Sequence, residues 1–436
     1  MTPGARVQAA IDILGAIAAA EAPADRVIAG WLRRARYMGG GDRRAVRALI
    51  YDVLRHRAAL DWWTERAGGV PGAARARVIA WLMLGAHQPP EALTGVFDGG
   101  RYRPAPLSDD ERARAEALAG QPMEHADQPA WVRGNLPEWL VAELEAAFGA
   151  ALAEELAALN REAPLDLRVN TLKTDRVGAL AALAADGLEA APTPLSPLGL
   201  RLSARATLPA TAAFRDGLVE VQDEGSQLAA LLVDARPGQA VCDLCAGAGG
   251  KTLALAAAMA NQGRLLACDV EATRLRPMAP RLRRAGVDLV ETQVIAAEDD
   301  GWPTDPTESF DRVLVDAPCS GSGAWRRNPD ARWRLDPETL AGFAPVQDRL
   351  LRGAARLVRP GGRLVYVTCS LLPRENADRV AAFLAEHGDF RPVPIGEVWP
   401  HAVGGAPPAD GPFLTLTPAR QGTDGFFVAI LERTTP

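Results

Sequence analysis

Hydrophobic and polar positions follow two different periods along this chain, and the change of period divides it into regions. From Gly4 to about Ala86, apolar residues recur at the 3.6-residue spacing of amphipathic helices. Asp25 and Asp42 stand where helix starts are expected, and the glycines at 39–41 separate two helices. The N-terminal region is therefore predicted to be all-α.

The second half of the chain alternates short apolar runs with helical patterns. Strands are predicted near Val241, Leu266, Val290, Val313, Val365 and Phe427. Such alternation is typical of a doubly wound, Rossmann-like α/β sheet. Between the two regions, residues 88–137 have the Pro-, Gly- and Asp-rich composition of a linker, and LDLRVNTLK (165–173) predicts a further strand.

These patterns predict three domains in the 436 residues, a length that favours two or three. Residues 1–130 form a helical domain with its linker, residues 131–228 a small α/β subdomain, and residues 229–436 the Rossmann-like domain. The formal net charge of −6 argues against a protein that coats nucleic acid through bulk charge. Local basic patches remain compatible with it.

Arginine carries almost all of the positive charge, because Lys173 and Lys251 are the only lysines. Between residues 26 and 57, the arginines with few acids among them include Arg33, Arg34, Arg36, Arg43, Arg44, Arg47, Arg55 and Arg57. Such a run is either a solvated helix face or an RNA-binding surface, since the guanidinium group fits phosphate well.

The cysteines all fall in the second half, on or beside predicted strands: Cys242, Cys245, Cys268, Cys319 and Cys369. An odd number without a secretory signal indicates reduced thiols in a cytosolic protein. No apolar run approaches the ~20 residues of a membrane span, and Gln8, Asp12 and Glu21 interrupt the N-terminal stretch. We therefore expect a cytoplasmic protein with no membrane partner.

The stretch QAVCDLCAGAGGKT (239–252) predicts a buried strand, a glycine loop and the start of a helix. This arrangement presents backbone N–H groups and a helix N-terminus to a ligand. The next strand, LLACD, ends at Asp269, where a nucleotide-type ribose is usually bound. Asp269 has an alternative role as the N-cap of the following helix.

Other ligand classes fit this loop less well. It lacks the GxGxxG of dinucleotide-binding folds, and Cys245 replaces the first glycine of a P-loop, although Lys251 could still contact a carboxylate or phosphate. Cys242 and Cys245 have zinc-site spacing but no second pair of ligands, so no metal is expected. The remaining nucleotide-like ligand is S-adenosylmethionine.

Two further predicted strands each end just before a cysteine: Cys319 in FDRVLVDAPCS (310–320) and Cys369 in GGRLVYVTCS (361–370). Methylation of an exocyclic amine needs no nucleophile, whereas pyrimidine C5 must first be activated by addition of a thiolate to C6. A second group near the first then helps to release the product. Cys319 and Cys369 meet both needs; the alternative is that they pack as small hydrophobic residues, as we expect for Cys242 and Cys268.

Several segments together resemble the Sun/RsmB-type RNA cytosine-5 methyltransferases: RVNTLK, VQDEGSQ, CDLCAGAGGKT, DAPCSGSG, VYVTCS and DGFFVAIL. They occur in the family's order from Leu165 onward, and the helical N-terminus is similar to a NusB-type RNA-binding domain. The resemblance implies S-adenosylmethionine-dependent methylation of cytosine C5 in RNA, above all in 16S (small-subunit) rRNA. We expect the chain to act as a monomer.

The resemblance also implies residue roles. Cys369 would attack C6, Cys319 would assist release of the methylated base, Asp316 would hydrogen-bond the cytosine edge, and Lys251 would lie close to both. The cofactor would be held by Cys245, Ala246, Gly247, Ala248, Gly249, Gly250, Lys251, Asp269, Arg274, Asp299 and Asp316. Ala248 departs from the family's usual Pro, and Asp299 is chosen over the neighbouring acids Glu298 and Asp300.

The loop RRNPDARWRL (326–335) is a second candidate RNA contact, because basic and aromatic residues interleave there. A solvated loop is the alternative. For the whole chain, two other functions stay open: the same chemistry on tRNA, or a non-catalytic RNA-binding factor in ribosome assembly. DNA is disfavoured, because DNA cytosine-5 enzymes take their nucleophile from the PC position and lack the TCS cysteine.

Overall fold

The computed structural model describes residues 1–296, 309–409 and 411–435. Contacts divide the chain into two compact units. One contains Met1–Glu162 and Trp325–Asp336, and the other contains Ala163–Ala324 and Pro337–Pro436. The predicted boundaries at residues 130 and 228 stay a prediction, because both sheets of the protein lie in the second unit.

The described residues of the first unit form helices, which confirms the all-α prediction. The helices are α1 (Pro3–Ala18), α2 (Ala24–Arg34), α3 (Gly40–Arg55), α4 (Arg57–Arg66), α5 (Ala74–Leu84), α6 (Pro90–Val96), α7 (Asp109–Leu118), α8 (Ala130–Arg133), α9 (Leu140–Phe148), η1 (Gly149–Ala151), α10 (Leu152–Asn160) and α17 (Ala331–Arg334). Asp25 and Asp42 lie in first turns, where a carboxylate favours the helix dipole, while Pro23 and Gly39 take the cap positions.

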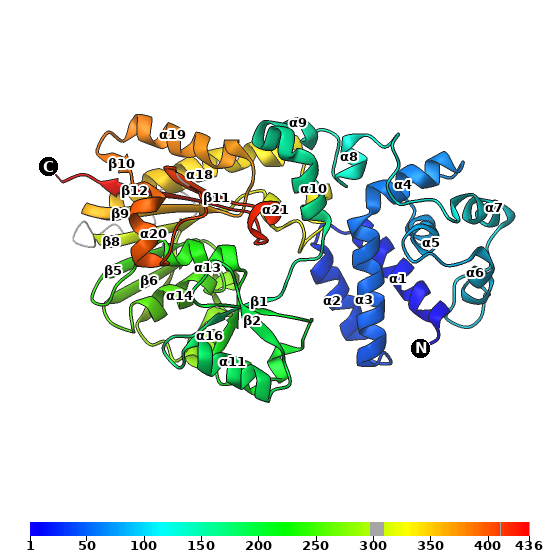
Figure 1. Cartoon of the computed structure of the whole chain (residues 1–436), viewed down its shortest axis with the longest axis horizontal. Coiled ribbons are helices and arrows are strands. Elements are labelled where there is room, and N and C mark those ends of the chain that lie inside the picture. Colours follow the sequence, from blue (N-terminus) through cyan, green and yellow to red (C-terminus); the bar gives the residue numbers. More distant parts are fainter. Residues whose placement is uncertain (297–308, 410, 436) are drawn as a thin grey trace. The chain divides into compact units, whose positions relative to one another are not determined.

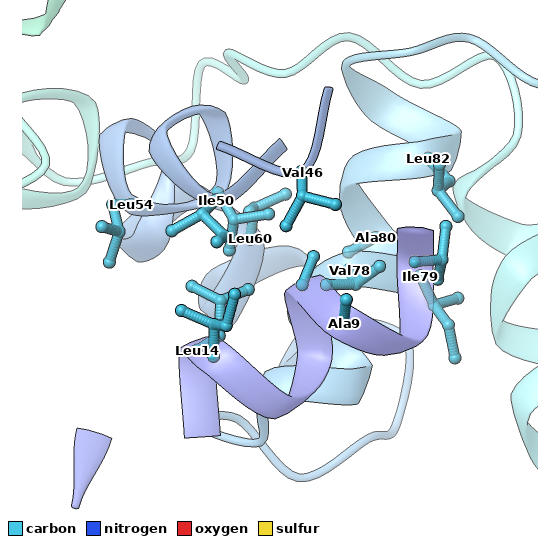
Figure 2. Packing of buried hydrophobic residues seen from close by; sticks show 14 of the residues in the cluster. Ala9, Leu14, Val46, Ile50, Leu54, Leu60, Val78, Ile79, Ala80 and Leu82 are labelled. Atoms are coloured by element: carbon cyan, nitrogen blue, oxygen red, sulfur yellow. The ribbon is translucent and has the colours of Figure 1, made fainter. Parts of the chain in front are cut away.

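The core of this unit lies where α1, α3, α4 and α5 meet. Figure 2 shows Leu14 of α1 facing Ile50 and Leu60, with Val78 of α5 close to Val46. Ile50, Leu60, Val46 and Val78 are fully buried. The 3.6-residue pattern of the sequence therefore corresponds to one shared apolar core.

A small antiparallel sheet opens the second unit, with strand order β2-β3-β1-β4. Its elements are β1 (Asp166–Val169), α11 (Arg176–Ala185), β2 (Ala190–Pro192), β3 (Gly199–Leu202), η2 (Leu208–Ala210), α12 (Ala212–Arg215) and β4 (Val219–Val221). Leu167, Leu183 and Leu200 are buried between the sheet and α11. The predicted strand at 165–173 and the small α/β unit are confirmed.

The large sheet has the order β10-β12-β9-β8-β5-β6-β7 in the described residues, with β11 paired to β12. Its strands are β5 (Ala240–Leu244), β6 (Arg264–Asp269), β7 (Val290–Val294), β8 (Phe310–Asp316), β9 (Val358–Thr368), β10 (Phe390–Pro392), β11 (Phe413–Leu416) and β12 (Phe426–Arg433). The run from β7 to β9 is parallel, and β12 lies antiparallel to β9. All six predicted strands are confirmed, while β10 and β11 were not predicted.

Helices cover both faces of this sheet (Figure 1). One face packs against α13 (Glu224–Leu231), α14 (Gly250–Ala258) and α20 (Ile395–Ala402). The other packs against α18 (Pro337–Leu357) and α19 (Ala377–Glu386). Alternate residues of each central strand point to opposite faces, as Val241 and Cys242 do in β5. The Rossmann-like fold class is thereby confirmed.

The remaining elements of the second unit are short: α15 (Ala272–Leu275), α16 (Met278–Ala285), η3 (Ser322–Ala324), η4 (Pro373–Glu375) and α21 (Pro418–Gln421). Among the described residues of both units, no helix combines the length and the apolar character that a bilayer crossing requires.

Candidate active site

The glycine loop follows β5 and bends sharply before α14 begins. Cys245, Gly247 and Gly249 all have positive φ, of 62°, 53° and 81°. At Gly249 a β-carbon would stand 2.6 Å from Cγ of Met278, so a side chain would be both strained and obstructed. The loop therefore needs glycine here, and it leaves backbone exposed at the start of a helix.

Three contacts hold the loop in place from outside. Arg168, in the RVNTLK segment, donates to the carbonyl of Gly250 at 2.9 Å, and Arg281 of α16 donates to the carbonyl of Ala248 at 2.6 Å. Asp269 accepts from the backbone N–H of Gly247 at 3.0 Å. Through Arg168, the RVNTLK segment of the small sheet directly supports the glycine loop. The contact of Arg281 with the loop was not predicted.

Asp269 ends β6 as predicted, and its carboxylate is nearly inaccessible to solvent, at 1% exposure. One oxygen accepts from Gly247 and the other from the N–H of Glu271 at 3.0 Å. The N-cap of α15 is Glu271, so the alternative role for Asp269 as that cap is wrong. Arg274 lies 3.5 Å from Asp269, and its half-exposed guanidinium group borders Gly247.

Asp243 is a buried acid of β5 that was not predicted. Its Oδ2 accepts from the hydroxyl of Thr252 at 2.6 Å, and Oδ1 has no hydrogen-bond partner among the described residues. Burial raises the pKa of this carboxyl to about 7, while the Thr252 hydrogen bond opposes that shift. An unpaired buried oxygen beside the glycine loop is what a polar ligand group would satisfy.

The predicted cofactor residues form one surface at the carboxyl edge of the sheet. The loop 245–251 follows β5, Asp269 and Arg274 follow β6, and Asp316 ends β8. The exposed Ala248 and half-buried Gly250 of the loop, the unpaired oxygen of Asp243 and the buried carboxylate of Asp269 fit a nucleoside with a charged tail. Asp299 lies outside the described residues.

The two candidate cysteines lie together, although 50 residues separate them. Cys319 follows β8 and Cys369 follows β9, and their sulfur atoms are 3.5 Å apart. A hydrogen bond between the backbones of Ala317 and Val367 keeps the two parallel strands in register up to the loops. The hydrogen bond with Cys369, followed by burial, raises the pKa of the Cys319 thiol well above its usual range.

Lys251 and Asp316 form an ion pair beside the thiols, with Nζ and Oδ2 2.8 Å apart. Burial alone would lower the pKa of Lys251, but the charge and hydrogen bond of Asp316 outweigh it and raise that pKa. The charge of Cys369 acts on Lys251 in the same direction. Phe426 places its ring 5.3 Å from the ammonium, a cation–π contact that was not predicted.

The expected packing role of the other cysteines agrees with their burial. Cys242 and Cys268 are fully buried in the core on the α18 face of the sheet. Burial raises the pKa of the half-buried Cys245 thiol well above its usual range. In the described residues no group of three or more His, Cys, Asp or Glu side chains could hold a metal ion.

Comparison with known proteins decides the family. Residues 230–432 match the model of the 16S rRNA methyltransferases RsmB/F, and residues 136–208 match the ferredoxin-like domain of the same family. The chain is 34% identical over 410 residues to the probable ribosomal RNA small subunit methyltransferase B of Synechocystis sp., covering 90% of this chain and 91% of that protein. This chain belongs to the RsmB/F family.

Other relatives agree with this assignment. The ribosomal RNA small subunit methyltransferase B of Klebsiella pneumoniae is 33% identical over 407 residues, covering 89% of this chain and 90% of that protein. The crystal structure of PH0851 has a TM-score of 0.78 at 26% identity and covers 99% of each chain. As a member of the RsmB/F family, the chain is an S-adenosylmethionine-dependent methyltransferase, and the glycine-loop surface described above is its candidate cofactor site.

One candidate RNA contact of this RsmB/F chain is corrected. Arg332 of the 326–335 loop is fully buried within the helical unit and donates to the carbonyls of Gly134, Asn135 and Leu159. Trp325, just before the loop, is also inaccessible to solvent. Neither side chain can therefore stack on a base, and both the RNA-facing and the solvated interpretations are wrong for Arg332.

The arginines of α2 and α3 divide by exposure. Arg33, Arg34, Arg36, Arg44 and Arg47 are exposed, Arg43 and Arg57 are half-buried, and Arg55 is buried. Arg57 lies over the ring of Trp333 at 4.4 Å, within the helical unit. The exposed members remain available for a polyanion.

Proposed function

We propose that this protein methylates C5 of cytosine in small-subunit ribosomal RNA through a covalent adduct between Cys369 and C6. One observation carries the proposal: two thiols lie 3.5 Å apart at the carboxyl edge of the sheet, next to the Lys251–Asp316 ion pair. A methyltransferase acting on nitrogen or on a ribose hydroxyl needs neither thiol. Two adjacent thiols match a reaction that must add a nucleophile and later expel it.

The surroundings favour different protonation states for the two thiols. The positive charge of Lys251 interacts favourably with an anionic Cys369, whereas the charges near Cys319 oppose its ionisation. We therefore assign the proton between the two sulfur atoms, which are 3.5 Å apart, to Cys319 and the nucleophilic role to Cys369. A thiolate at Cys369 is the stronger nucleophile.

The proposed reaction begins when Cys369 attacks C6 and the C5–C6 double bond becomes an enamine-like system with a nucleophilic C5. S-adenosylmethionine supplies the electrophilic methyl group that C5 takes up. Asp316 accepts a hydrogen bond from the cytosine edge, and Lys251 holds Asp316 in position. The loop 245–251, Asp269 and Arg274 hold the cofactor, and the side chain at Asp299 remains a proposed contact.

Release of the product requires a base. Once Cys369 is bonded to carbon, its hydrogen bond and charge no longer raise the pKa of Cys319, and that thiol gives its proton to solvent. Cys319 then removes the C5 proton, the electrons restore the double bond, and Cys369 leaves as a thiolate. One proton is released for each methyl group transferred, and the pair returns to its starting state.

The exposed arginines of the helical unit support RNA as the substrate. Arg33, Arg34, Arg36, Arg44 and Arg47 lie within one 15-residue stretch of α2 and α3 and the turn between them. Contacts of this kind bind phosphates without reading sequence, so they position rather than select the RNA.

The test is methylation in solution. Purified protein, S-adenosylmethionine and small-subunit rRNA are combined, and the digested nucleosides are analysed by mass spectrometry. We expect about one 5-methylcytidine for each rRNA molecule. Methylation at another atom would contradict the mechanism, transfer RNA as the better substrate would contradict the substrate, and RNA binding without methylation would favour the assembly-factor alternative.

A further inference from the structure

A buried carboxylate joins the two cysteine loops. Glu375 ends η4, five residues after the TCS sequence, and is only 1% exposed. Its Oε1 accepts from the backbone N–H of Ser320 at 2.8 Å. Its Oε2 accepts from the hydroxyl of Ser320 and from the hydroxyl of Ser370. The serine that follows each cysteine is thus bound to the same side chain.

Further hydrogen bonds close the connection around Glu375. Ser322 accepts from the N–H of Leu371 at 2.8 Å, and the N–H of Gly323 donates to the carbonyl of Cys369 at 2.9 Å. Gln347 of α18 donates to the carbonyl of Pro318 at 3.0 Å and to Glu375 at 3.3 Å. The two loops therefore form one hydrogen-bonded unit with a carboxylate at its centre.

Glu375 also acts on the thiols through its charge. The titratable and charged groups around the pair come from several elements: Tyr366 from β9, Cys369 from the loop after it, Glu375 from η4, Asp316 from β8 and Lys251 from α14. The negative charge of Glu375 adds to the hydrogen bond with Cys369 and to burial in raising the pKa of Cys319. Lys251 is a cation that acts on Cys369, whose charge in turn raises the pKa of Lys251.

We propose that Glu375 is a positioning residue that holds Cys319 and Cys369 at reacting distance by binding both cysteine loops. It binds Ser320 and Ser370 directly, so it acts through the loops rather than on the base. The inference rests on the proposed function, in which Cys319 is the base and Cys369 the nucleophile.

The experiment compares Glu375→Gln, which keeps the shape and removes the charge, with Glu375→Ala, which removes both. Ser320→Ala, a milder change on one loop, serves if the other two fail to fold. Asp311→Asn is the matched control: Asp311 lies at the opposite end of β8, where it accepts from the N–H of Ala240 at 2.8 Å. Urea denaturation of each variant establishes how much stability is lost.

Two readouts separate a positioning role from a merely structural one. In methylation assays we expect Glu375→Gln and Glu375→Ala to lower kcat at least about tenfold with little change in KM for RNA, while Asp311→Asn keeps both. In the protein without RNA, alkylation of Cys319 is followed against pH by mass spectrometry. We expect its midpoint to move to lower pH in Glu375→Gln and to stay in place in Asp311→Asn.

The alkylation measurement needs no substrate, so it tests the inference independently of the proposed function. A wild-type enzyme that makes no 5-methylcytidine overturns the proposed function. An active wild type whose alkylation midpoint and kcat are matched by folded Glu375 variants overturns the inference. Ser320→Ala should lower kcat more than Asp311→Asn does, and equal kcat values for these two variants would also overturn the inference.

Discussion

Cys319 and Cys369 are identical side chains 3.5 Å apart, yet their surroundings differ. Cys369 interacts with the cation Lys251, and Cys319 faces the carboxylate of Glu375. This asymmetry, rather than the identity of the residues, divides the roles of nucleophile and base. The order of the two cysteine motifs along the sequence does not reveal this difference in surroundings.

The division of roles predicts opposite phenotypes for the two alanine variants. Cys319→Ala should form the adduct but fail to release it, so a protein–RNA complex that survives denaturing electrophoresis should accumulate. Cys369→Ala should form none and lose methylation by at least about 10³-fold. Cys242→Ala, a fully buried cysteine in the core, is the control and should retain activity. A trapped complex with Cys369→Ala would reverse the assignment.

Asp243 predicts an unusual pH dependence of stability. Burial raises the pKa of its carboxyl from 3.8 to about 7 in the folded protein. Between these two pH values the unfolded chain has released the Asp243 proton, whereas the folded protein still holds it. The free energy of unfolding therefore falls as pH rises through this range, and the loss is complete above about pH 7. Asp243→Asn removes the titration.

We therefore expect Asp243→Asn to gain stability relative to wild type as pH rises from about 4 to about 7, by up to a few kcal/mol. Urea denaturation across that range measures the difference. Parallel curves for the two proteins would show that the carboxyl titrates normally.

At the scale of elements, the glycine loop depends on backbone conformation more than on side chains. Gly249 combines a φ of 81° with a β-carbon position 2.6 Å from Met278. Gly250, the next residue, begins α14, and its β-carbon would meet only ordinary contacts. Gly250 can therefore accept a β-carbon, whereas Gly249 cannot do so without strain.

Gly249→Ala should lower the free energy of unfolding by at least about 1 kcal/mol and weaken S-adenosylmethionine binding. Gly250→Ala is the matched control for stability and should leave the free energy of unfolding unchanged or slightly raised, since alanine favours a helix. Thermal denaturation and calorimetric titration with the cofactor measure both effects. Equal behaviour of the two variants would contradict this account of the loop.

Local motifs were predictable because they carry their own geometry. The strand, glycine loop and helix at 239–252 and the acid at Asp269 depend on a few neighbouring residues. The Lys251–Asp316 pair spans 65 residues, yet the carboxyl edge of a parallel sheet brings such ends together. The sheet topology therefore accounts for most of the candidate site.

Other features could not be predicted, because their contact partners lie far away in the sequence and belong to no recognisable motif. Arg332 lies in a basic and aromatic pattern that buried and exposed loops share, and only the carbonyls from 134–159 decide its burial. Glu375 follows the TCS motif closely, but its binding to Ser320 depends on the neighbouring loop. Asp243 lies within the buried strand β5, and nothing in the sequence pattern distinguishes it from its apolar neighbours as a site residue.

At the scale of the whole molecule, the segment Trp325–Asp336, which precedes α18, belongs to the helical unit rather than to the unit that contains the sheet. Arg332 anchors it with hydrogen bonds to the carbonyls of Gly134 and Asn135 and to the side-chain oxygen of Asn160, the last at 2.7 Å. The N–H of Ala24 donates to Asp330 at 3.0 Å in the same segment. The helical unit is therefore assembled from two separate parts of the sequence.

Arg332→Ala should destabilise this unit by about 3 kcal/mol or more, because it leaves buried carbonyls without a donor. Arg334→Ala is the control, since Arg334 is exposed and pairs with Asp330 at 3.0 Å, and it should cost less than about 1 kcal/mol. Hydrogen exchange of α8 and α10 in the full chain measures the local effect. Equal protection in both variants would show that the segment does not support the helices.

The central claim is cytosine C5 methylation of small-subunit rRNA, and bisulfite sequencing of cellular RNA tests it most directly. Total RNA is compared from cells with the gene, without it, and with Cys369→Ala in its place. We predict that one cytosine of the small-subunit rRNA is protected from conversion only when the wild-type protein is present. Protection that persists without the gene or with Cys369→Ala, or that is lost in transfer RNA instead, would contradict the account.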